Sequence, residues 1–175
     1  AIVDGFQVDA ANKAANTQCL LLNQCASNTL RNSMLHNGGA YGVYAINSLL
    51  NEFQNCSIYS NTSYGICNFN ATIYMRNCDL RSNSSHGYFG THQQPTYVTM
   101  ENCLIRNNTQ RGLSLGQFAS GVLVNCNIVS NGNDGIGQTA AYSSWSIINC
   151  IIAGNGAYGA REAFSTQMGQ LNLSY

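Results

Sequence analysis

The sequence predicts an all-β solenoid, a right-handed parallel β-helix with three short strands in each coil. Three observations support this fold: a motif that returns every 22–25 residues, columns of apolar residues at fixed places in the repeat, and very little charge. Charged residues make up 8% of the 175 residues and hydrophobic residues 45%, whereas typical soluble domains are roughly 25% charged. We expect one β-helix domain over residues 1–175, as a fragment of a longer chain.

The repeat begins with Asn and Cys, continues with an aliphatic residue and ends with a second Asn and a Gly. Its leading asparagines are Asn32, Asn55, Asn77, Asn102, Asn125 and Asn149. The steps between them are 23, 22, 25, 23 and 24 residues. One backbone turn per repeat fits this period, whereas a propeller blade needs about 40 residues and a leucine-rich repeat needs several Leu at fixed offsets.

Three columns of side chains are expected to point inward, because side chains alternate along a strand. The column two residues before the leading Asn is Leu30, Phe53, Met75, Met100, Leu123 and Ile147. The column one residue after it is Ser33, Cys56, Cys78, Cys103, Cys126 and Cys150. The column three residues after it is Leu35, Ile58, Leu80, Ile105, Ile128 and Ile152. The uneven spacing predicts a bend at the leading Asn, where side-chain amides can bond from coil to coil.

A third strand is expected after each turn glycine. The turn glycines are Gly42, Gly65, Gly87, Gly112, Gly135 and Gly159. The strands that follow them are expected to start at Val43, Ile66, Tyr88, Leu113, Ile136 and Ala160. We expect these glycines to adopt positive φ, which Gly accepts without a steric penalty.

The cysteine pattern favours packing over chemistry. Eight cysteines could form disulfides in a secreted chain, but five of them share one inward column. Free Cys packs as a small buried hydrophobic residue, so we expect free thiols; a bridge between Cys19 and Cys25 stays open as an alternative. There is no CxxC motif and no Cys/His spacing typical of zinc, so we expect no metal and no cofactor.

The pattern Asn-Cys-x-Ile-x-x-Asn-x-x-x-Gly-Ile resembles the repeats of the right-handed β-helix superfamily of pectate lyases, polygalacturonases, periplasmic NosD-like proteins and phage tailspikes. The resemblance covers roughly residues 1–175. It implies a β-helix that acts on or binds acidic or surface polysaccharides, and a homotrimer if the chain is tailspike-like. The motif itself consists of packing residues, and a fold alone does not define a function.

Composition excludes two classes of partner. Seven Lys and Arg balance seven Asp and Glu, so there is no basic field to hold nucleic acid. No apolar run reaches the roughly 18 residues of a membrane-spanning helix. Glycoside hydrolysis needs two carboxylates about 5–10 Å apart, and no two acidic residues occupy adjacent places in one outward column. This counts against catalysis within these residues.

Two groups of residues that do not repeat are the candidate sites. The residues before successive turn glycines should align on one edge, where Tyr64, His86, Arg111, Asp134 and Tyr158 could hold a sugar. The alternative is a row of solvated turn residues. Val122, Val124, Val129, Ile148 and Ile151 should form an outward apolar strip, which is typical of an interface with another subunit or another segment. The alternative is scattered apolar surface residues.

These observations lead to one main function and two alternatives. We expect a structural or carbohydrate-binding β-helix domain of an extracellular, cell-surface or virion protein, such as a fibre or tailspike. The first alternative is a polysaccharide lyase or glycoside hydrolase. The second is a purely architectural spacer.

Overall fold

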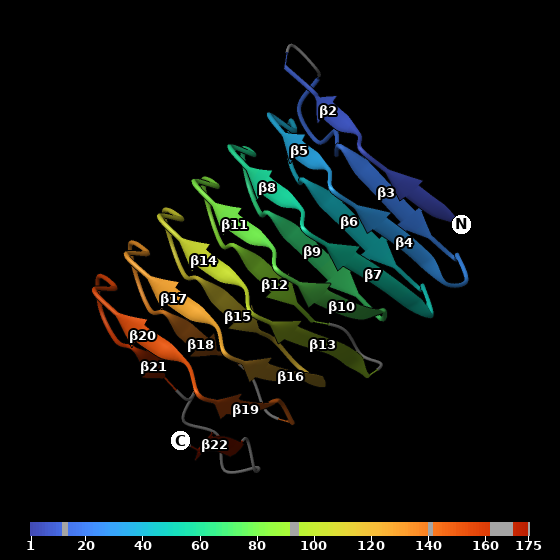
Figure 1. Cartoon of the computed structure of the whole chain (residues 1–175). Coiled ribbons are helices and arrows are strands. Elements are labelled where there is room, and N and C mark those ends of the chain that lie inside the picture. The colour runs from blue at the N-terminus through green and yellow to red at the C-terminus, as the bar shows by residue number, and fades with distance from the viewer. Residues whose placement is uncertain (12–13, 92–94, 140–141, 162–169, 175) are drawn as a thin grey trace.

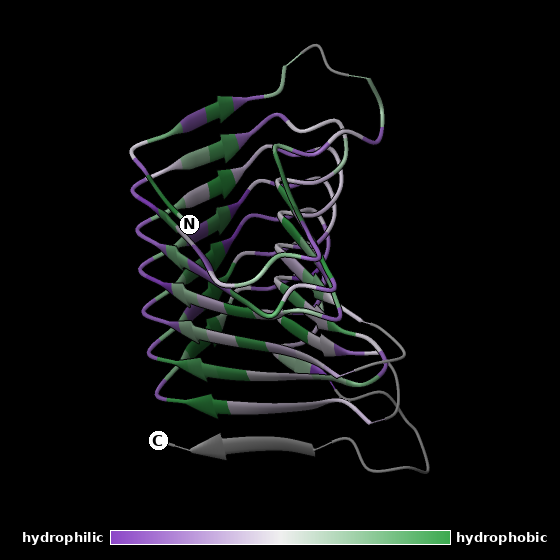
Figure 2. Ribbon diagram, turned by 90° about the vertical axis from the view of Figure 1, so that its right-hand side faces the viewer, coloured by the Kyte–Doolittle hydropathy of each residue, from purple (hydrophilic) through white to green (hydrophobic). Residues whose placement is uncertain are grey.

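The structure is a stack of β-coils without a helix among the residues it describes (Figure 1). The computed structural model describes residues 1–11, 14–91, 95–139 and 142–161, and the backbone of 170–174. The strands form three parallel sheets of eight, seven and seven strands, here named A, B and C. Each coil contributes one strand to each sheet, which makes about seven coils, and Figure 2 shows them stacked one below another.

The strands of each sheet follow in order of pairing. Sheet A contains β1 (Ile2–Asp4), β4 (Asn28–Arg31), β7 (Leu50–Gln54), β10 (Thr72–Arg76), β13 (Thr96–Glu101), β16 (Ala119–Val124), β19 (Ser144–Ile148) and β22 (Gln170–Ser174). Sheet B contains β2 (Gln7–Asp9), β5 (Met34–His36), β8 (Ser57–Tyr59), β11 (Asp79–Arg81), β14 (Leu104–Arg106), β17 (Asn127–Val129) and β20 (Ile151–Ala153). Sheet C contains β3 (Leu20–Asn23), β6 (Val43–Ile46), β9 (Ile66–Phe69), β12 (Tyr88–Gly90), β15 (Leu113–Leu115), β18 (Ile136–Gln138) and β21 (Ala160–Arg161).

The predicted inward columns are confirmed. Phe53 pairs in register with Leu30 and Met75, and Leu80 pairs with Ile58 and Ile105. All six side chains are buried, and they belong to one continuous core along the solenoid. The third strands begin at the six predicted residues. A repeated residue type therefore stacks on its equivalent at the spacing of paired strands, about 4.8 Å.

The leading asparagines make the predicted bend. All six have positive φ, between 49° and 53°, a left-handed conformation that Asn tolerates better than most residues. The side chain of Asn55 donates to Asn32 at 2.9 Å, and that of Asn77 donates to Asn55 at 3.1 Å. These exposed amides link neighbouring coils at the corner between sheets A and B.

The second Asn of the motif forms a stronger ladder in the interior. Both the backbone N–H and the side-chain Nδ2 of Asn83 donate to Oδ1 of Asn108, at 3.1 and 2.9 Å. Asn108 donates in the same way to Asn131, and its Nδ2 also reaches the carbonyl oxygen of Leu80 at 3.1 Å. Asn83 and Asn108 are fully buried. Each side-chain amide thus bonds to four polar groups that water cannot reach.

The reason predicted for the turn glycines, a positive φ, is wrong. None of the six has positive φ; the described glycines with positive φ are Gly5 and Gly154. A Cβ at Gly65 would lie 2.5 Å from the carbonyl oxygen of Gly87 and 2.8 Å from Nδ2 of Asn83. Glycine is needed there because the backbone passes against the Asn ladder, which leaves no space for a side chain.

The cysteines are free thiols, as expected. Cys56, Cys78, Cys103 and Cys126 are buried in one column. Cys19 and Cys25 are also free, so the alternative bridge between them is not formed. Burial raises the pKa of Cys67, on sheet C, to about 12, which keeps this thiol protonated and unreactive at neutral pH.

We predict that the interior Asn ladder contributes more to stability than the exposed one. Replacing Asn108 by Ala (Asn108→Ala) leaves buried donors on Asn83 and acceptors on Asn131 and Leu80 without partners. The expected loss is about 3–5 kcal/mol of unfolding free energy, measured by urea denaturation. The control Asn77→Gly keeps the left-handed bend and removes an exposed amide, and should cost about 1 kcal/mol or less. Equal losses in the two variants would contradict this ranking.

Candidate functional site

The coil geometry brings the predicted turn residues together at the corner between sheets B and C. Each precedes a turn glycine, so the constant register of the coils stacks them in one column. The rings of Tyr41 and Tyr64 are stacked 5.5 Å apart with an angle of 3° between their planes. Tyr64 stacks in turn on His86, at 5.3 Å and 9°. The first half of the column is therefore a pile of parallel rings.

The second half of the column is polar and also connected. The backbone N–H of Arg111 donates to Nδ1 of His86 at 3.2 Å, and its side-chain Nε donates to Oδ2 of Asp134 at 2.9 Å. The backbone N–H of Tyr158 donates to Oδ1 of Asp134 at 3.4 Å. The alignment of Tyr64, His86, Arg111, Asp134 and Tyr158 is thus present, whereas their role in binding stays a prediction.

The side chains of this column differ in burial, and therefore in the role that each can have. Asp134 is fully buried and Arg111 is 19% exposed, so the carboxylate orients the guanidinium and does not itself face a ligand. Burial and the nearby charge of Arg111 lower the pKa of His86 to about 4. His86 is therefore neutral at physiological pH, and since its Nδ1 accepts a hydrogen bond, its proton lies on Nε2. Burial also raises the pKa of Tyr64, which keeps its hydroxyl a hydrogen-bond donor.

Sheet C adds aromatic residues that the sequence analysis did not select. Phe89 stacks on Tyr64 with ring centroids 5.0 Å apart. Phe69 meets the edges of Phe89 and Tyr44, at 6.5 and 5.9 Å, and Tyr44 lies 5.4 Å from Tyr41. Strand alternation could have found Tyr44 and Phe89, because each lies one residue after an inward residue of the third strand.

We call this continuous group of rings the aromatic ledge. Its members come from the turn column and from the outward face of sheet C: Tyr41, Tyr44, Tyr64, Phe69, His86 and Phe89. All except the buried His86 are half-buried, with part of each ring open to solvent.

Small residues beside the ledge let Arg111 lie flat on sheet C. A Cβ at Gly137 would lie 2.5 Å from Nε and 2.6 Å from Cδ of Arg111. Ser114, next to Gly137 in the sheet, is buried, and its hydroxyl has no hydrogen-bond partner. The ledge therefore ends at a guanidinium held in place by a buried carboxylate.

Comparison with known proteins agrees with this architecture. The model of the family described as right handed beta helix region matches residues 5–152. This chain belongs to the right-handed β-helix family. All strands from β2 to β19 lie within the matched residues.

Several solved structures are similar to this chain at low sequence identity, and one of them superposes with a TM-score above 0.5. A mutant of the periplasmic alginate epimerase AlgG superposes with a TM-score of 0.54 at 12% identity, covering 85% of this chain and 49% of that one. The pectate lyase Pel9A gives 0.49 at 11% identity, covering 81% and 57%. The A-module of the Azotobacter vinelandii mannuronan C-5 epimerase AlgE6 gives 0.42 at 13% identity, covering 86% and 58%. This β-helix spans about half the length of these chains, and no curated protein sequence matches it.

The predicted apolar strip lies at the corner between sheets A and B, near the C-terminal end of the β-helix. Val124 and Ile148 are neighbours on β16 and β19. Ile151 is 61% exposed and Val122 37%, while Val124, Val129 and Ile148 are half-buried. The five side chains face outward as predicted, and their role as an interface stays a prediction.

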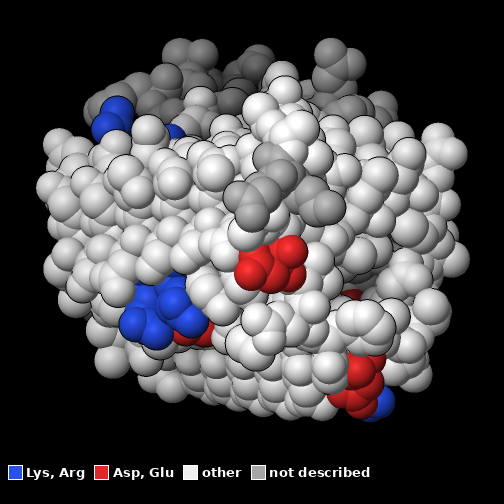
Figure 3. Space-filling view, turned by 90° about the horizontal axis from the view of Figure 1, so that it is seen from above, with Lys and Arg blue, Asp and Glu red and all other residues white. Residues whose placement is uncertain are grey.

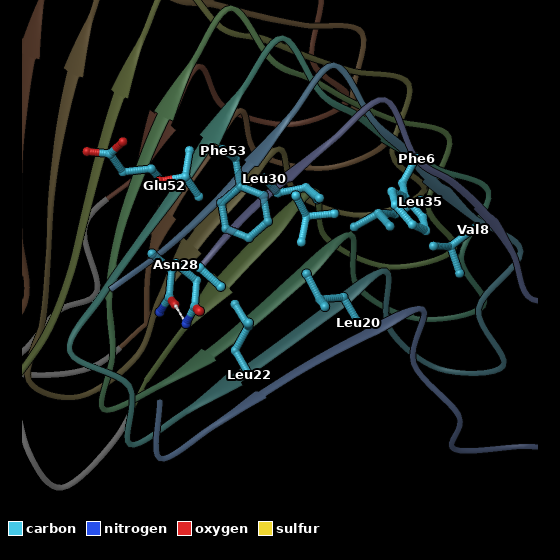
Figure 4. Close-up of a pocket in the computed structure, with 13 residues that line it drawn as sticks. Phe6, Val8, Leu20, Leu22, Asn28, Leu30, Leu35, Glu52 and Phe53 are labelled. Carbon is cyan, nitrogen blue, oxygen red and sulfur yellow. Dashed lines mark hydrogen bonds between the residues drawn. The ribbon is translucent and has the colours of Figure 1, made fainter. Parts of the chain in front are cut away.

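One apolar hollow is the open N-terminal end of the core. It has a volume of about 360 Å³ and lies at the N-terminal end, where Figure 4 shows Leu30, Leu35 and Phe53 of the inward columns around it. Phe6 of the first coil also lines it. Since its walls are core residues, this hollow is not the site that polar sugar hydroxyls would need.

Neither a metal-binding group of side chains nor a membrane-spanning helix is present in the described part of the β-helix. Its His, Cys, Asp and Glu residues form no group of three or more that could hold a metal ion. It also contains no helix long and apolar enough to cross a membrane. Charged side chains gather in a few small groups on the otherwise uncharged face seen in Figure 3.

We predict that His86 makes the stability of the β-helix depend on pH. Because its pKa is about 4 in the folded chain and near 6.5 when unfolded, the unfolded chain binds the extra proton between these values. Stability contributed by neutral His86 is thus lost as the pH falls below about 6.5, amounting to about 2 kcal/mol at pH 5. Urea denaturation at pH 7.5 and pH 5 measures this loss.

The control for this prediction is His86→Gln, which keeps a polar side chain that does not titrate. The variant should lose about 2 kcal/mol less than the wild type between the two pH values. Identical losses in both proteins would show that His86 is not the group responsible.

Proposed function

We propose that this chain is a polysaccharide-binding β-helix domain, and that the glycan lies along the aromatic ledge. The observation that carries the proposal is the continuous group of six rings, partly exposed and ending at the oriented guanidinium of Arg111. The apolar C–H faces of sugars pack against aromatic rings, while tyrosine hydroxyls and a guanidinium bond to sugar oxygens.

The rigidity of the ledge supports binding. Tyr64 is held between Tyr41 and His86 on one axis and against Phe89 on another. Side chains already fixed by their neighbours lose little conformational entropy when a ligand arrives. Large aromatic residues of this kind are also the usual anchors of binding surfaces.

Turnover is the alternative, and the described carboxylates favour binding over it. Asp134 is buried against Arg111, and Asp79 is bound by two arginines. No two carboxylates in the described residues are register neighbours in a sheet. The similar alginate epimerase acts on a polysaccharide, and that supports the polymer class. A hydrolase that uses the usual pair of carboxylates would need carboxylates beyond those described.

The location of the chain follows from the same proposal. Polysaccharides of this class are found at cell surfaces, so we place the domain outside the cytoplasm, in an extracellular, cell-surface or virion fibre protein. One similar structure is a periplasmic enzyme, which supports an export route. A purely architectural spacer would need no partly exposed aromatic ledge.

The binding test compares aromatic residues on two faces. Phe89→Ala and Phe69→Ala remove rings from the ledge, and the control Tyr97→Ala removes a ring that is 51% exposed on sheet A. Affinity electrophoresis through a panel of neutral and acidic polysaccharides should show at least about tenfold weaker retention for the two ledge variants, the loss of about 1.4 kcal/mol or more. Tyr97→Ala should match the wild type.

Two results would count against this function. Retention of all three variants equal to that of the wild type on every polymer would remove the ledge as the site. Steady formation of an unsaturated product, followed by ultraviolet absorbance, or of new reducing ends would favour the lyase or hydrolase alternative.

We also propose that the apolar strip is buried between copies of this chain in a homotrimer. The strip covers the corner between sheets A and B on two adjacent coils, so identical strips of three copies can meet around one axis. Ile151→Asp places a charge in the strip and should convert the trimer to a monomer in sedimentation velocity. The control Leu49→Asp alters an apolar residue that is 74% exposed elsewhere and should leave the trimer intact. A monomeric wild type would exclude this assembly.

A further inference from the structure

Five arginines of the described residues form an ion pair with a carboxylate, and two of these five share the same one. Three arginines each have a carboxylate of their own: Arg31 with Asp4, Arg76 with Glu101 and Arg111 with Asp134. On the outward face of sheet B, Arg81 and Arg106 share a single carboxylate, that of Asp79. This group therefore carries one positive charge in excess, on a chain whose total charge is zero.

The geometry of the shared carboxylate leaves part of each guanidinium free. Oδ2 of Asp79 accepts from Nε of Arg81 and from Nη2 of Arg106, both at 3.0 Å, and Oδ1 accepts from Nε of Arg106 at 3.3 Å. The hydrogen bond of Arg81 within the described residues uses Nε, so its two terminal nitrogens are left to bond to another group. The side chains of Arg81 and Arg106 are 30% and 36% exposed.

Stacking holds the guanidinium of Arg81 in one orientation. The guanidinium carbon of Arg81 lies 4.1 Å from the ring centroid of Tyr59. Tyr59 stacks on His36, at 4.7 Å and 8°, and the ring nitrogens of His36 bond to Gln7 and Asn37. A charge placed over an aromatic face is stabilised by it. Arg81 is thus fixed by Asp79 on one side and by the stacked rings on the other.

Placing two arginines beside Asp79 lowers the stability of the fold, although one arginine would be enough to hold this carboxylate. Arg81 and Arg106 are direct register partners on β11 and β14, and like charges opposite each other in a sheet repel. One arginine would neutralise the carboxylate. Violations of a local rule of this kind are expected where a protein binds something, and a negative group between the two guanidinium ions would remove the repulsion.

We propose that Arg81 and Arg106 form an anion site on sheet B, which binds a carboxylate or sulfate group of an acidic glycan. The planar fork of Arg matches such oxyanions with two parallel hydrogen bonds. A nucleic acid is the poorer ligand, because it needs many cations in a row, and this face has two. That the ligand is a polysaccharide rests on the proposed function. The two arginines lie on sheet B and are not part of the aromatic ledge.

The test uses matched charged and neutral polymers. Affinity electrophoresis with polygalacturonate, dextran sulfate and plain dextran separates carboxylate, sulfate and uncharged ligands. Arg81→Met and Arg106→Met should each reduce retention by the preferred acidic polymer at least fivefold, with the wild-type interaction weakening as salt is added. The control Arg76→Met removes an exposed arginine that has its own carboxylate, and should stay within twofold of the wild type.

A second variant keeps the test decisive if a methionine variant does not fold, which thermal denaturation would reveal. Arg81→Lys retains the charge and loses the fork, so its retention should fall between those of the wild type and Arg81→Met. Wild-type retention of Arg81→Lys and Arg106→Met on both acidic polymers would overturn the site, as would an equal loss in Arg76→Met.

The outcomes separate this inference from the proposed function. Loss of binding to acidic polymers in the arginine variants, with no effect of Phe89→Ala on any polymer, would support the anion site and reject the ledge. Loss of binding in Phe89→Ala, with wild-type binding in the arginine variants, would reject the anion site and support the ledge.

Discussion

The constant register between coils is the constraint on which the rest of this structure depends. Each residue lies above its equivalent in the next coil, so one residue type at one position becomes a column along the whole solenoid. The buried Asn ladder holds that register. Asn108 bonds through backbone and side chain to the coils on both sides of it, and a slip of one residue would leave several buried polar groups without partners. The turn glycines serve the same ladder, because Gly65 allows the backbone to pass against Asn83.

Register also explains why the candidate sites lie where the repeat fails. A column of identical residues builds the coil, whereas a column of different residues can build a site. The corner between sheets B and C carries rings in its early coils and an ion pair in its later ones, so that Tyr64, His86 and Arg111 become neighbours from three separate repeats. On sheet B the same principle places Tyr59, Arg81 and Arg106 in one line. Two faces of one solenoid thus carry two different chemistries, one aromatic and one cationic.

Much of the fold could be predicted from the sequence, because period and alternation are local properties. The inward columns, the bend at the leading Asn and the starts of the third strands follow directly from the spacing of the repeat. The alignment of the turn column follows from it too. The role of the turn glycines could not be predicted correctly, since their need for glycine comes from the neighbouring coil and not from their own φ. The aromatic ledge could be predicted only in part for a related reason. The contact between Phe89 and Tyr64 joins a strand to the turn of another coil.

The sequence by itself determined which residues stack on which, because a repeat of nearly constant length leaves one way to superpose the coils. It also predicted that no two acidic residues occupy adjacent places in one outward column. Tertiary structure alone decided which members of the columns remain available. Asp134 is buried and positions Arg111, His86 stays neutral beside that cation, and Arg81 keeps its terminal nitrogens for another group although it shares a carboxylate. These differences depend on burial and on distances between coils, which a one-dimensional pattern does not contain.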